Sequence, residues 1–310
     1  MHGASRFAPS TTGRAHPGTW LAALLSWLDA RQQDKKWILR LEDLDPTRST
    51  PEKSKLLEDD IRWLGLDWDL FEKQSLNQVR YESTMDELQA LGLLYPCNLS
   101  RKEIQAFGKK ALNGGWIYPN ISRNRQLPAA GWRTCTEIIR LKLPDVSIEF
   151  HDDANETTTY YPPTDFGDPV IRRRDGAFSY HFASVVDDIS TKVDRIVRGR
   201  DLMDTTPLQI ALFKILGKPI PTYRHHLLFL EKHKDKLSKY HGATGGTEIR
   251  KNTRPNRFCG ELAHISGILP EATPITPSEL VEKFDWLKVL QNDILVEWQP
   301  NPKGSRLVSK

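Results

Sequence analysis

The first third of the chain switches between apolar runs and polar, turn-forming stretches, the pattern of a parallel sheet with crossover helices. A strand is predicted to end in the turn 7–13, and a helix follows over 19–30, where an apolar run of nine residues includes a single serine. Residues 37–41 form a short apolar strand that ends in carboxylates. Because ligands of open α/β sheets bind outside the carboxyl ends of the strands, Ser10 and Glu42 lie at a predicted site.

Two further helices are predicted from their end signals. Thr50 is a typical N-cap, Pro51 stands at the first helical position, and Gly65 comes just past the last apolar position. A second helix is expected over 77–91 and is stopped by Gly92.

The pattern changes over about 97–176, where turn-rich stretches surround one clear strand at 137–143. Strand-like alternation resumes over 178–186 and 195–198. We therefore interpret the middle region as an insertion between two halves of one nucleotide-binding fold.

The last third is predicted to be mostly helical. A helix opens at Thr206 and closes at Gly217, and weaker helical patterns follow over 248–268 and 277–290. The expected organisation is an α/β fold in these segments: 1–96, first half of the nucleotide-binding fold; 97–176, inserted connective subdomain; 177–222, second half; 223–310, lysine-rich loop and helical C-terminal segment.

Composition excludes few classes of protein. The 310 residues, 38% of them hydrophobic and 27% charged, are typical of a globular protein of two to three subdomains. The net charge of +4 mildly favours a polyanionic partner. Three scattered cysteines favour a reducing compartment, and we expect the cytoplasm. No secretory leader is recognised, and the longest apolar run is well short of the ~20 residues that a membrane span needs.

Two short motifs suggest a clamp for nucleotide phosphates. His16-Pro17-Gly18-Thr19 stands where a turn enters a helix, so free backbone N–H groups and an imidazole face an anion. Lys236-Leu237-Ser238-Lys239-Tyr240 supplies two mobile positive charges about 220 residues later. Either motif alone is weak. Together they predict an enzyme that activates a carboxylate with ATP.

These motifs and three others resemble the glutamyl branch of the class I aminoacyl-tRNA synthetases. All five occur in that family's order, and they are the segments 6–19 (RFAPSTTGRAHPGT), 40–46 (RLEDLDP), 180–188 (YHFASVVDD), 196–202 (IVRGRDL) and 236–240 (KLSKY). The resemblance implies a class I Rossmann nucleotide-binding fold with an inserted acceptor-type α+β subdomain and a short, mostly helical C-terminal segment.

The chain length indicates which subfamily the chain resembles. Only 71 residues follow Lys239 within the 310 residues, whereas an anticodon-binding domain would take about 100; we expect none. The chain therefore resembles the stand-alone glutamyl-Q tRNA(Asp) synthetases. That subfamily activates L-glutamate without tRNA and esterifies it to the queuosine base in the anticodon of tRNA(Asp). The resemblance also implies ATP with Mg²⁺, and we expect a monomer with no membrane partner.

The family's pattern implies a role for particular residues. Glutamate offers an ammonium group and a side-chain carboxylate, which call for an anion and a planar cation. The substrate positions implied are Arg6, Phe7, Ala8, Pro9, Ser10, Glu42, Tyr180 and Arg198. The catalytic positions are His16, Gly18, Lys236 and Lys239, and the ATP contacts are His16, Gly18, Thr19 and Lys239.

Departures from the family's pattern bear on metal binding. Family members that bind zinc use three cysteines and a tyrosine, and the matching positions here are Cys97, Leu99, Tyr118 and Ser122. One thiolate and one phenol cannot close a tetrahedral site, so no zinc is expected. Mg²⁺ would be held largely by phosphates and water. Thr11 stands where the opening motif has proline.

Other interpretations remain open. Asp187-Asp188 could form an acid/base pair or, following a buried strand, could cap or pair locally. His225-His226 with His233 has only loose metal-like spacing. For the whole chain, the alternatives are a minimal glutamyl-tRNA synthetase that charges the tRNA 3′ end and a non-catalytic tRNA-binding paralogue.

Overall fold

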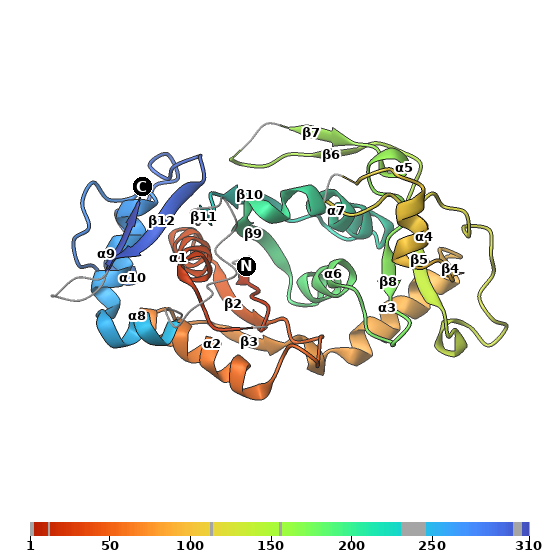
Figure 1. The fold of residues 1–310 in the computed structure, drawn as a ribbon, viewed down its shortest axis with the longest axis horizontal. Coiled ribbons are helices and arrows are strands. Elements are labelled where there is room, and N and C mark those ends of the chain that lie inside the picture. Colours follow the sequence, from red (N-terminus) through yellow and green to blue (C-terminus); the bar gives the residue numbers. More distant parts are fainter. Residues whose placement is uncertain are drawn as a thin grey trace. The chain divides into compact units, whose positions relative to one another are not determined.

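The computed structural model describes residues 3–11, 13–111, 114–154, 157–230, 246–299 and 306–309 (Figure 1). The helices within these residues are α1 (Pro17–Gln32), α2 (Pro51–Leu64), α3 (Gln78–Ala90), α4 (Arg101–Ala106), α5 (Pro162–Asp165), α6 (Tyr180–Ser190), α7 (Thr206–Ile215), α8 (Gly246–Asn252), α9 (Pro255–Ile265) and α10 (Pro277–Val281). The 3₁₀ turns are η1 (Gln74–Leu76), η2 (Trp132–Thr134) and η3 (Arg200–Thr205). No helix among them is both long and apolar enough to cross a bilayer.

The strands form separate sheets. They are β1 (Ala4–Phe7), β2 (Lys36–Leu41), β3 (Leu70–Lys73), β4 (Leu94–Cys97), β5 (Ile138–Leu141), β6 (Ile148–Phe150), β7 (Thr158–Tyr160), β8 (Val170–Arg172), β9 (Val193–Gly199), β10 (Thr222–His226), β11 (Phe229–Leu230), β12 (Ile294–Gln299) and β13 (Arg306–Ser309). The chain divides into two compact units, the first comprising 1–73, 195–201 and 223–310, and the second 74–194 and 202–222. The four segments predicted from the sequence remain a prediction.

The first unit is organised around a five-stranded sheet with the order β10-β9-β1-β2-β3. Strands β1 and β2 pair in parallel, and so do β2 and β3. The predicted alternation of strand and helix in this region is therefore confirmed. Both crossover connections contain the predicted helices, α1 between β1 and β2 and α2 between β2 and β3.

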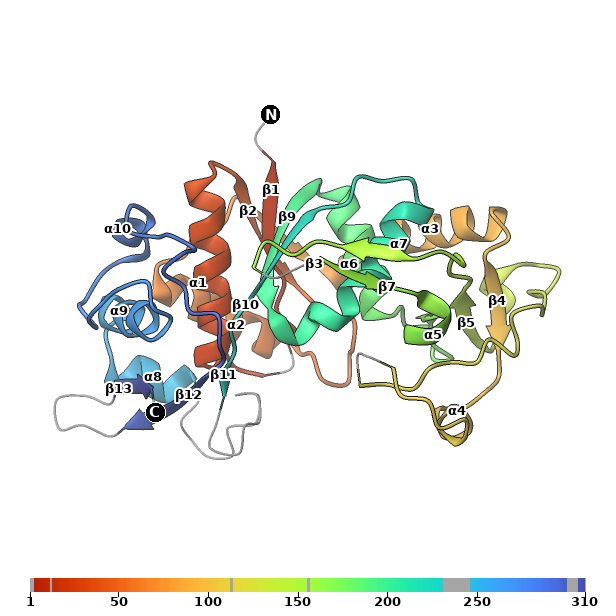
Figure 2. The ribbon, with the colours of Figure 1, turned by 90° about the horizontal axis from the view of Figure 1, so that it is seen from above.

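Helix α1 is buried on nearly every side. Figure 2 shows it between the strands β1 and β2 and the helices α9 and α10. Its apolar residues belong to the main core of the unit, and two tryptophans fix its rotation: Trp20 Nε1 donates to the Asp60 carbonyl at 3.1 Å, and Trp27 Nε1 donates to the Asp67 carbonyl at 3.0 Å. A buried ion pair joins Asp29 of α1 to Arg195 of β9 at 3.0 Å. The start of this helix is consequently held by the core.

Helix α2 confirms the prediction from its end signals. The Thr50 hydroxyl accepts the backbone N–H of Lys53 at 3.3 Å, and Pro51 is the first helical residue. Gly65 has a φ of +90°, a left-handed conformation that closes the helix without a β-carbon clash. These signals were readable because every group that makes them lies within one helical turn.

The C-terminal part of the first unit contains helices in both predicted regions and a sheet that was not predicted. The helix predicted over 277–290 is confirmed only for Pro277–Val281, where α10 ends. The pattern over 248–268 is divided into α8 and α9 because Pro255 begins a new helix. A three-stranded sheet follows in the order β11-β12-β13, with β12 antiparallel to β13. Val296 and Leu307 of this sheet are buried in the main core of the unit.

The second unit contains the antiparallel sheet β4-β5-β8 and the hairpin β6-β7. The strand predicted over 137–143 is confirmed as β5. Helix α3 packs against α6, where the Tyr81 ring lies 5.3 Å from Phe178 and 6.3 Å from Phe182. These contacts form an aromatic core for the unit.

The prediction of extended structure over 178–186 is wrong. The chain is helical as α6 from Tyr180 to Ser190. Phe182, Val185 and Val186 are buried at the spacing of one helical face, and a short apolar run of this kind does not distinguish a strand from a buried helix.

Candidate functional site

The carboxyl ends of β1 and β2 bring Ser10 and Glu42 side by side. The two residues form an isolated parallel bridge beyond the ends of the strands. The Glu42 N–H donates to the Pro9 carbonyl at 3.0 Å, and the Thr11 N–H donates to the Glu42 carbonyl at 3.3 Å. A proline at position 11 could not make the second bond. The departure at Thr11 therefore extends the pairing at the edge where the predicted site lies.

Two arginines are buried next to this edge. Arg6 of β1 is 3% exposed, and Arg40 of β2 is fully buried. The Arg40 guanidinium lies 3.9 Å from a carboxylate oxygen of Glu42. Glu42 places an acidic side chain at this edge, the type of group that pairs with an ammonium. The predicted set of site residues did not include Arg40, although it stands two positions before Glu42 in the quoted motif.

The segment leading into the site is also packed. Phe7 stacks on Trp37 with ring centroids 6.0 Å apart and planes within 3°. Ala8 and Pro9 are half-buried, and Ser10 is exposed. The backbone of this segment is therefore fixed while its last side chain faces solvent.

His16 is the N-cap of α1. Its carbonyl accepts the N–H groups of Thr19 at 2.8 Å and Trp20 at 3.1 Å, and Pro17 begins the helix. The imidazole lies over Gly18, where an added β-carbon would stand 3.1 Å from the ring. The tetrapeptide thus places a histidine ring at the positive end of the helix, which is suited to an anion.

At the end of β9, Arg198 meets two aromatic residues of β10. Its Nε donates to His225 Nε2 at 3.0 Å, and its guanidinium carbon lies 5.4 Å from the centroid of the Tyr223 ring. The rings of Tyr223 and His225 are parallel within 1°. Arg198 is 5% exposed, so its orientation is set by these neighbours. The sequence reading considered His225 only for metal binding and missed this contact.

The predicted site residues that the structure describes are divided between the two units. Arg6–Ser10, His16–Thr19, Glu42 and Arg198 belong to the first unit. Tyr180 is the first residue of α6 in the second unit, where its ring lies 5.2 Å from that of His181. Lys236, Lys239 and Tyr240, together with His233, fall outside the residues that the structure describes.

Asp187 serves as a buried acceptor within the second unit. It receives hydrogen bonds from Gln74 Nε2 at 2.9 Å, Asn77 Nδ2 at 2.9 Å and the Tyr81 hydroxyl at 2.7 Å. The interpretation as a local cap or pair after a strand is wrong, because these donors lie more than 100 residues away in the sequence. The side chain is fully buried. Asp187 therefore ties α6 to α3.

The positions compared with a zinc site hold a different arrangement. Ser122 donates its N–H to the Tyr118 hydroxyl at 2.8 Å, and the Arg140 guanidinium lies 3.7 Å from the centroid of the Tyr118 ring. Burial raises the pKa of the Cys97 thiol, but hydrogen bonds with Arg140 and Tyr118 outweigh it and leave the pKa below its ordinary value. Within the described ranges, no cluster of three or more histidine, cysteine or acidic side chains could hold a metal ion.

Comparison with known proteins gives a family and a fold. The family described as tRNA synthetases class I (E and Q), catalytic domain, matches residues 4–285. A glutamyl-Q tRNA(Asp) synthetase of Symbiobacterium thermophilum is 36% identical over 309 residues, covering 94% of this chain and 95% of that protein.

Longer relatives match over only part of their length. A glutamate–tRNA ligase of Aquifex aeolicus is 32% identical over 99% of this chain but 59% of its own. The crystal structure of a glutamate tRNA ligase from Elizabethkingia meningosepticum superposes with a TM-score of 0.80 and 23% identity, over 95% of this chain and 67% of that one. This structural likeness shows that the chain has the same fold.

Proposed function

Because this chain belongs to the class I tRNA synthetases of the glutamyl and glutaminyl group, we propose that it activates L-glutamate without tRNA and transfers it to queuosine in the anticodon of tRNA(Asp). Family membership makes the chain an ATP-dependent ligase. The substrate, the acceptor base, the monomeric state and the cytoplasmic location are parts of the proposal.

One observation carries the choice of acceptor. The relative named for glutamyl-Q tRNA(Asp) matches along 95% of its length, whereas the glutamate–tRNA ligase matches along 59%. The chain therefore corresponds to nearly the whole of the first protein. The observed charges fit the choice of amino acid, since Glu42 offers an anion to the ammonium group and Arg198 a cation to the side-chain carboxylate.

The first chemical step is formation of an adenylate. The α-carboxylate of glutamate attacks the α-phosphorus of ATP, a P–O bond forms, and pyrophosphate leaves in line. His16 and the start of α1 would hold the phosphates, with Gly18 and Thr19 in that turn, and Lys236 and Lys239 would neutralise the charge that grows in the transition state. Mg²⁺ supplies further neutralisation when it is bound to the phosphates.

The second step is esterification. A hydroxyl of the queuosine base attacks the carbonyl carbon of the adenylate, the hydroxyl proton is released, and AMP leaves. No covalent bond to the enzyme forms in either step. Arg6, Ser10, Glu42 and Tyr180 would keep the glutamyl group in place between the two steps.

Two assays test the proposal. Incubation with glutamate, ATP and labelled pyrophosphate, without tRNA, is expected to give label in ATP. Charging total tRNA with labelled glutamate, followed by nuclease digestion, is expected to leave label on the anticodon fragment. Absence of exchange would contradict activation without tRNA. Label on the terminal adenosine would instead support a minimal glutamyl-tRNA synthetase, which the 32% identity to a glutamate–tRNA ligase keeps as the second candidate.

A further inference from the structure

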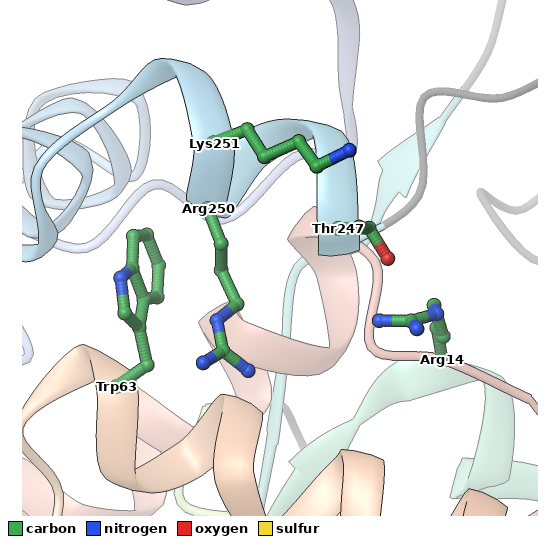
Figure 3. Close-up of a pocket in the computed structure, with 5 residues that line it drawn as sticks. All are labelled: Arg14, Trp63, Thr247, Arg250 and Lys251. Carbon is green, nitrogen blue, oxygen red and sulfur yellow. The ribbon is translucent and has the colours of Figure 1, made fainter.

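A pocket of about 360 Å³ opens in the first unit, and none of the residues assigned above to glutamate or ATP lines it. It is lined by Arg14, Trp63, Thr247, Arg250 and Lys251 (Figure 3). Arg14 comes from the segment before α1, Trp63 from α2, and the other three from α8. In this view Arg250 projects between the Trp63 ring and Arg14, and Lys251 lies on the side of α8 nearer Thr247.

The pocket carries an excess of positive charge. Arg250 Nη1 lies 2.9 Å from a carboxylate oxygen of Asp60, which is fully buried, so that pair is neutral and fixed. Arg14 and Lys251 are exposed, and neither forms an ion pair with any residue that the structure describes. Arg14, Arg250 and Lys251 therefore bring three positive charges to the pocket, and one carboxylate, Asp60, interacts with both arginines. The remaining excess of two positive charges is typical of sites for phosphodiesters.

An aromatic ring borders the same pocket. Trp63 is half-buried, and its inner side packs against Trp20 and Phe258 with ring centroids 5.8 Å apart in both pairs. These contacts hold the indole in place while its remaining surface lines the pocket. A fixed aromatic surface beside cations is the arrangement on which proteins stack an unpaired base next to its phosphate.

We propose that this pocket binds the backbone of the substrate RNA, with Arg14 and Lys251 on a phosphate and Trp63 against an adjacent base. The inference rests on the proposed function, because it takes tRNA as the polyanion. A free phosphate ion would use the two cations but not the indole. The phosphates of ATP are assigned to the start of α1, and none of the residues given that role lines the pocket.

The test is RNA affinity measured against salt concentration. Wild type, Arg14→Ala, Lys251→Ala and the double variant are titrated with fluorescently labelled tRNA(Asp) transcript. Each single variant is expected to weaken binding severalfold and to reduce the slope of log K against log salt by about one. Lys36→Ala is the matched control, since this exposed lysine at the amino end of β2 does not line the pocket, and its affinity and slope should equal wild type.

The indole has a separate signature. Trp63→Leu is expected to weaken RNA binding with an unchanged salt slope, because stacking releases no counterions, and Trp63→Phe is expected to restore most of the affinity. Thermal melting of both variants checks that the core around Trp20 is intact. If Trp63→Leu fails to fold, Trp63→Phe and the two charge variants still decide the question.

Three outcomes would overturn the inference. One is unchanged affinity and slope in the Arg14→Ala, Lys251→Ala double variant. Another is an equal loss in the Lys36→Ala control, which would indicate general charge attraction. The third is a raised KM for ATP in tRNA-free exchange with RNA affinity intact, which would assign the pocket to nucleotide phosphates. Failure of the wild type to catalyse exchange would contradict the proposed function, and the RNA titrations would still stand.

Discussion

Arg198 donates its Nε hydrogen to His225 Nε2 at 3.0 Å, so the histidine ring acts as the acceptor. A protonated Nε2 could not accept, and the contact therefore requires the ring to carry its proton on Nδ1. The Arg198 guanidinium also lies 5.4 Å from the centroid of the Tyr223 ring. The orientation of a proposed glutamate-binding cation thus depends on a residue of the neighbouring strand.

Arg198→Ala should weaken glutamate binding at least about tenfold while leaving ATP binding nearly unchanged, because a charge-assisted hydrogen bond is worth about 1.5–3 kcal/mol. His225→Ala should show the same selectivity to a smaller degree, since it removes the support and not the charge. Exchange kinetics with each substrate varied in turn measure both. Equal loss for glutamate and ATP would contradict the assignment.

Lys239→Ala should slow glutamate activation about a hundredfold or more, the effect of removing one donor that stabilises transition-state charge. Single-turnover formation of the adenylate is the appropriate measurement. Lys232→Ala is the comparison, because it removes a lysine from the same lysine-rich stretch outside the motif. An unchanged rate in Lys239→Ala would remove that residue from the mechanism.

Asp187→Ala should destabilise the second unit by about 3 kcal/mol, because Gln74, Asn77 and Tyr81 would lose their shared buried acceptor. Asp187→Asn keeps one acceptor oxygen and should cost less. Denaturant unfolding followed by circular dichroism gives both values. A loss below about 1 kcal/mol in the alanine variant would show that the three donors find other partners.

Asp86 is expected to make stability depend on pH. Hydrogen bonds from Arg133 and from Trp132 Nε1 hold the pKa of Asp86 below its ordinary value. A carboxyl whose folded pKa is lowered stabilises the fold above its unfolded pKa of about 3.9 and loses that contribution as the pH falls through the folded pKa. Asp86→Asn should therefore lower Tm at pH 7 and have little effect near pH 2.

The neighbouring residue provides the control for that experiment. Glu87 is exposed on the same helix, and its side chain forms no ion pair or hydrogen bond within the described residues. Glu87→Gln should leave Tm unchanged at both pH values. A pH-independent effect of Asp86→Asn would show that its role is packing and not charge.

Metal analysis of the purified protein should find no stoichiometric zinc. Leu99 is packed against the cluster that contains Cys97, and Ser122 uses its backbone to bond the Tyr118 hydroxyl. The Arg140 guanidinium already provides a cation beside Cys97, the one thiol among the four compared positions. Treatment with a strong chelator should accordingly leave Tm unchanged. Zinc at one equivalent, or unfolding by the chelator, would contradict this.

The sequence predicted the parts of the fold whose determinants are local. The cap of α2 at Thr50 and its end at Gly65 require groups only one turn apart, and β2 contains a short apolar run between turns. The run around Phe182 failed because its apolar residues satisfy the pattern of a buried strand and of a buried helix equally well. Only packing against Tyr81 decides between them.

The sequence predicted which residues belong to the candidate site, but it predicted only part of how they contact one another. Ser10 and Glu42 could be placed side by side because parallel strands end at a common edge. The contact of Arg198 with His225 joins residues 27 positions apart on neighbouring strands, and no periodicity indicates it. No periodicity indicates the contacts of Asp187 either, because its donors belong to a turn and a helix more than 100 residues earlier in the sequence.

The burial of α1 has a consequence for how mutations would be recognised. The helix has His16 as its N-cap and is surrounded by core along most of its length, including Leu24 and Leu28, which are fully buried. A substitution that leaves a cavity at either leucine would let the helix shift, and the imidazole of His16 would shift with it. A genetic screen for enzymes that bind nucleotide but turn over slowly should therefore recover substitutions deep in the interior, at positions that never meet a substrate.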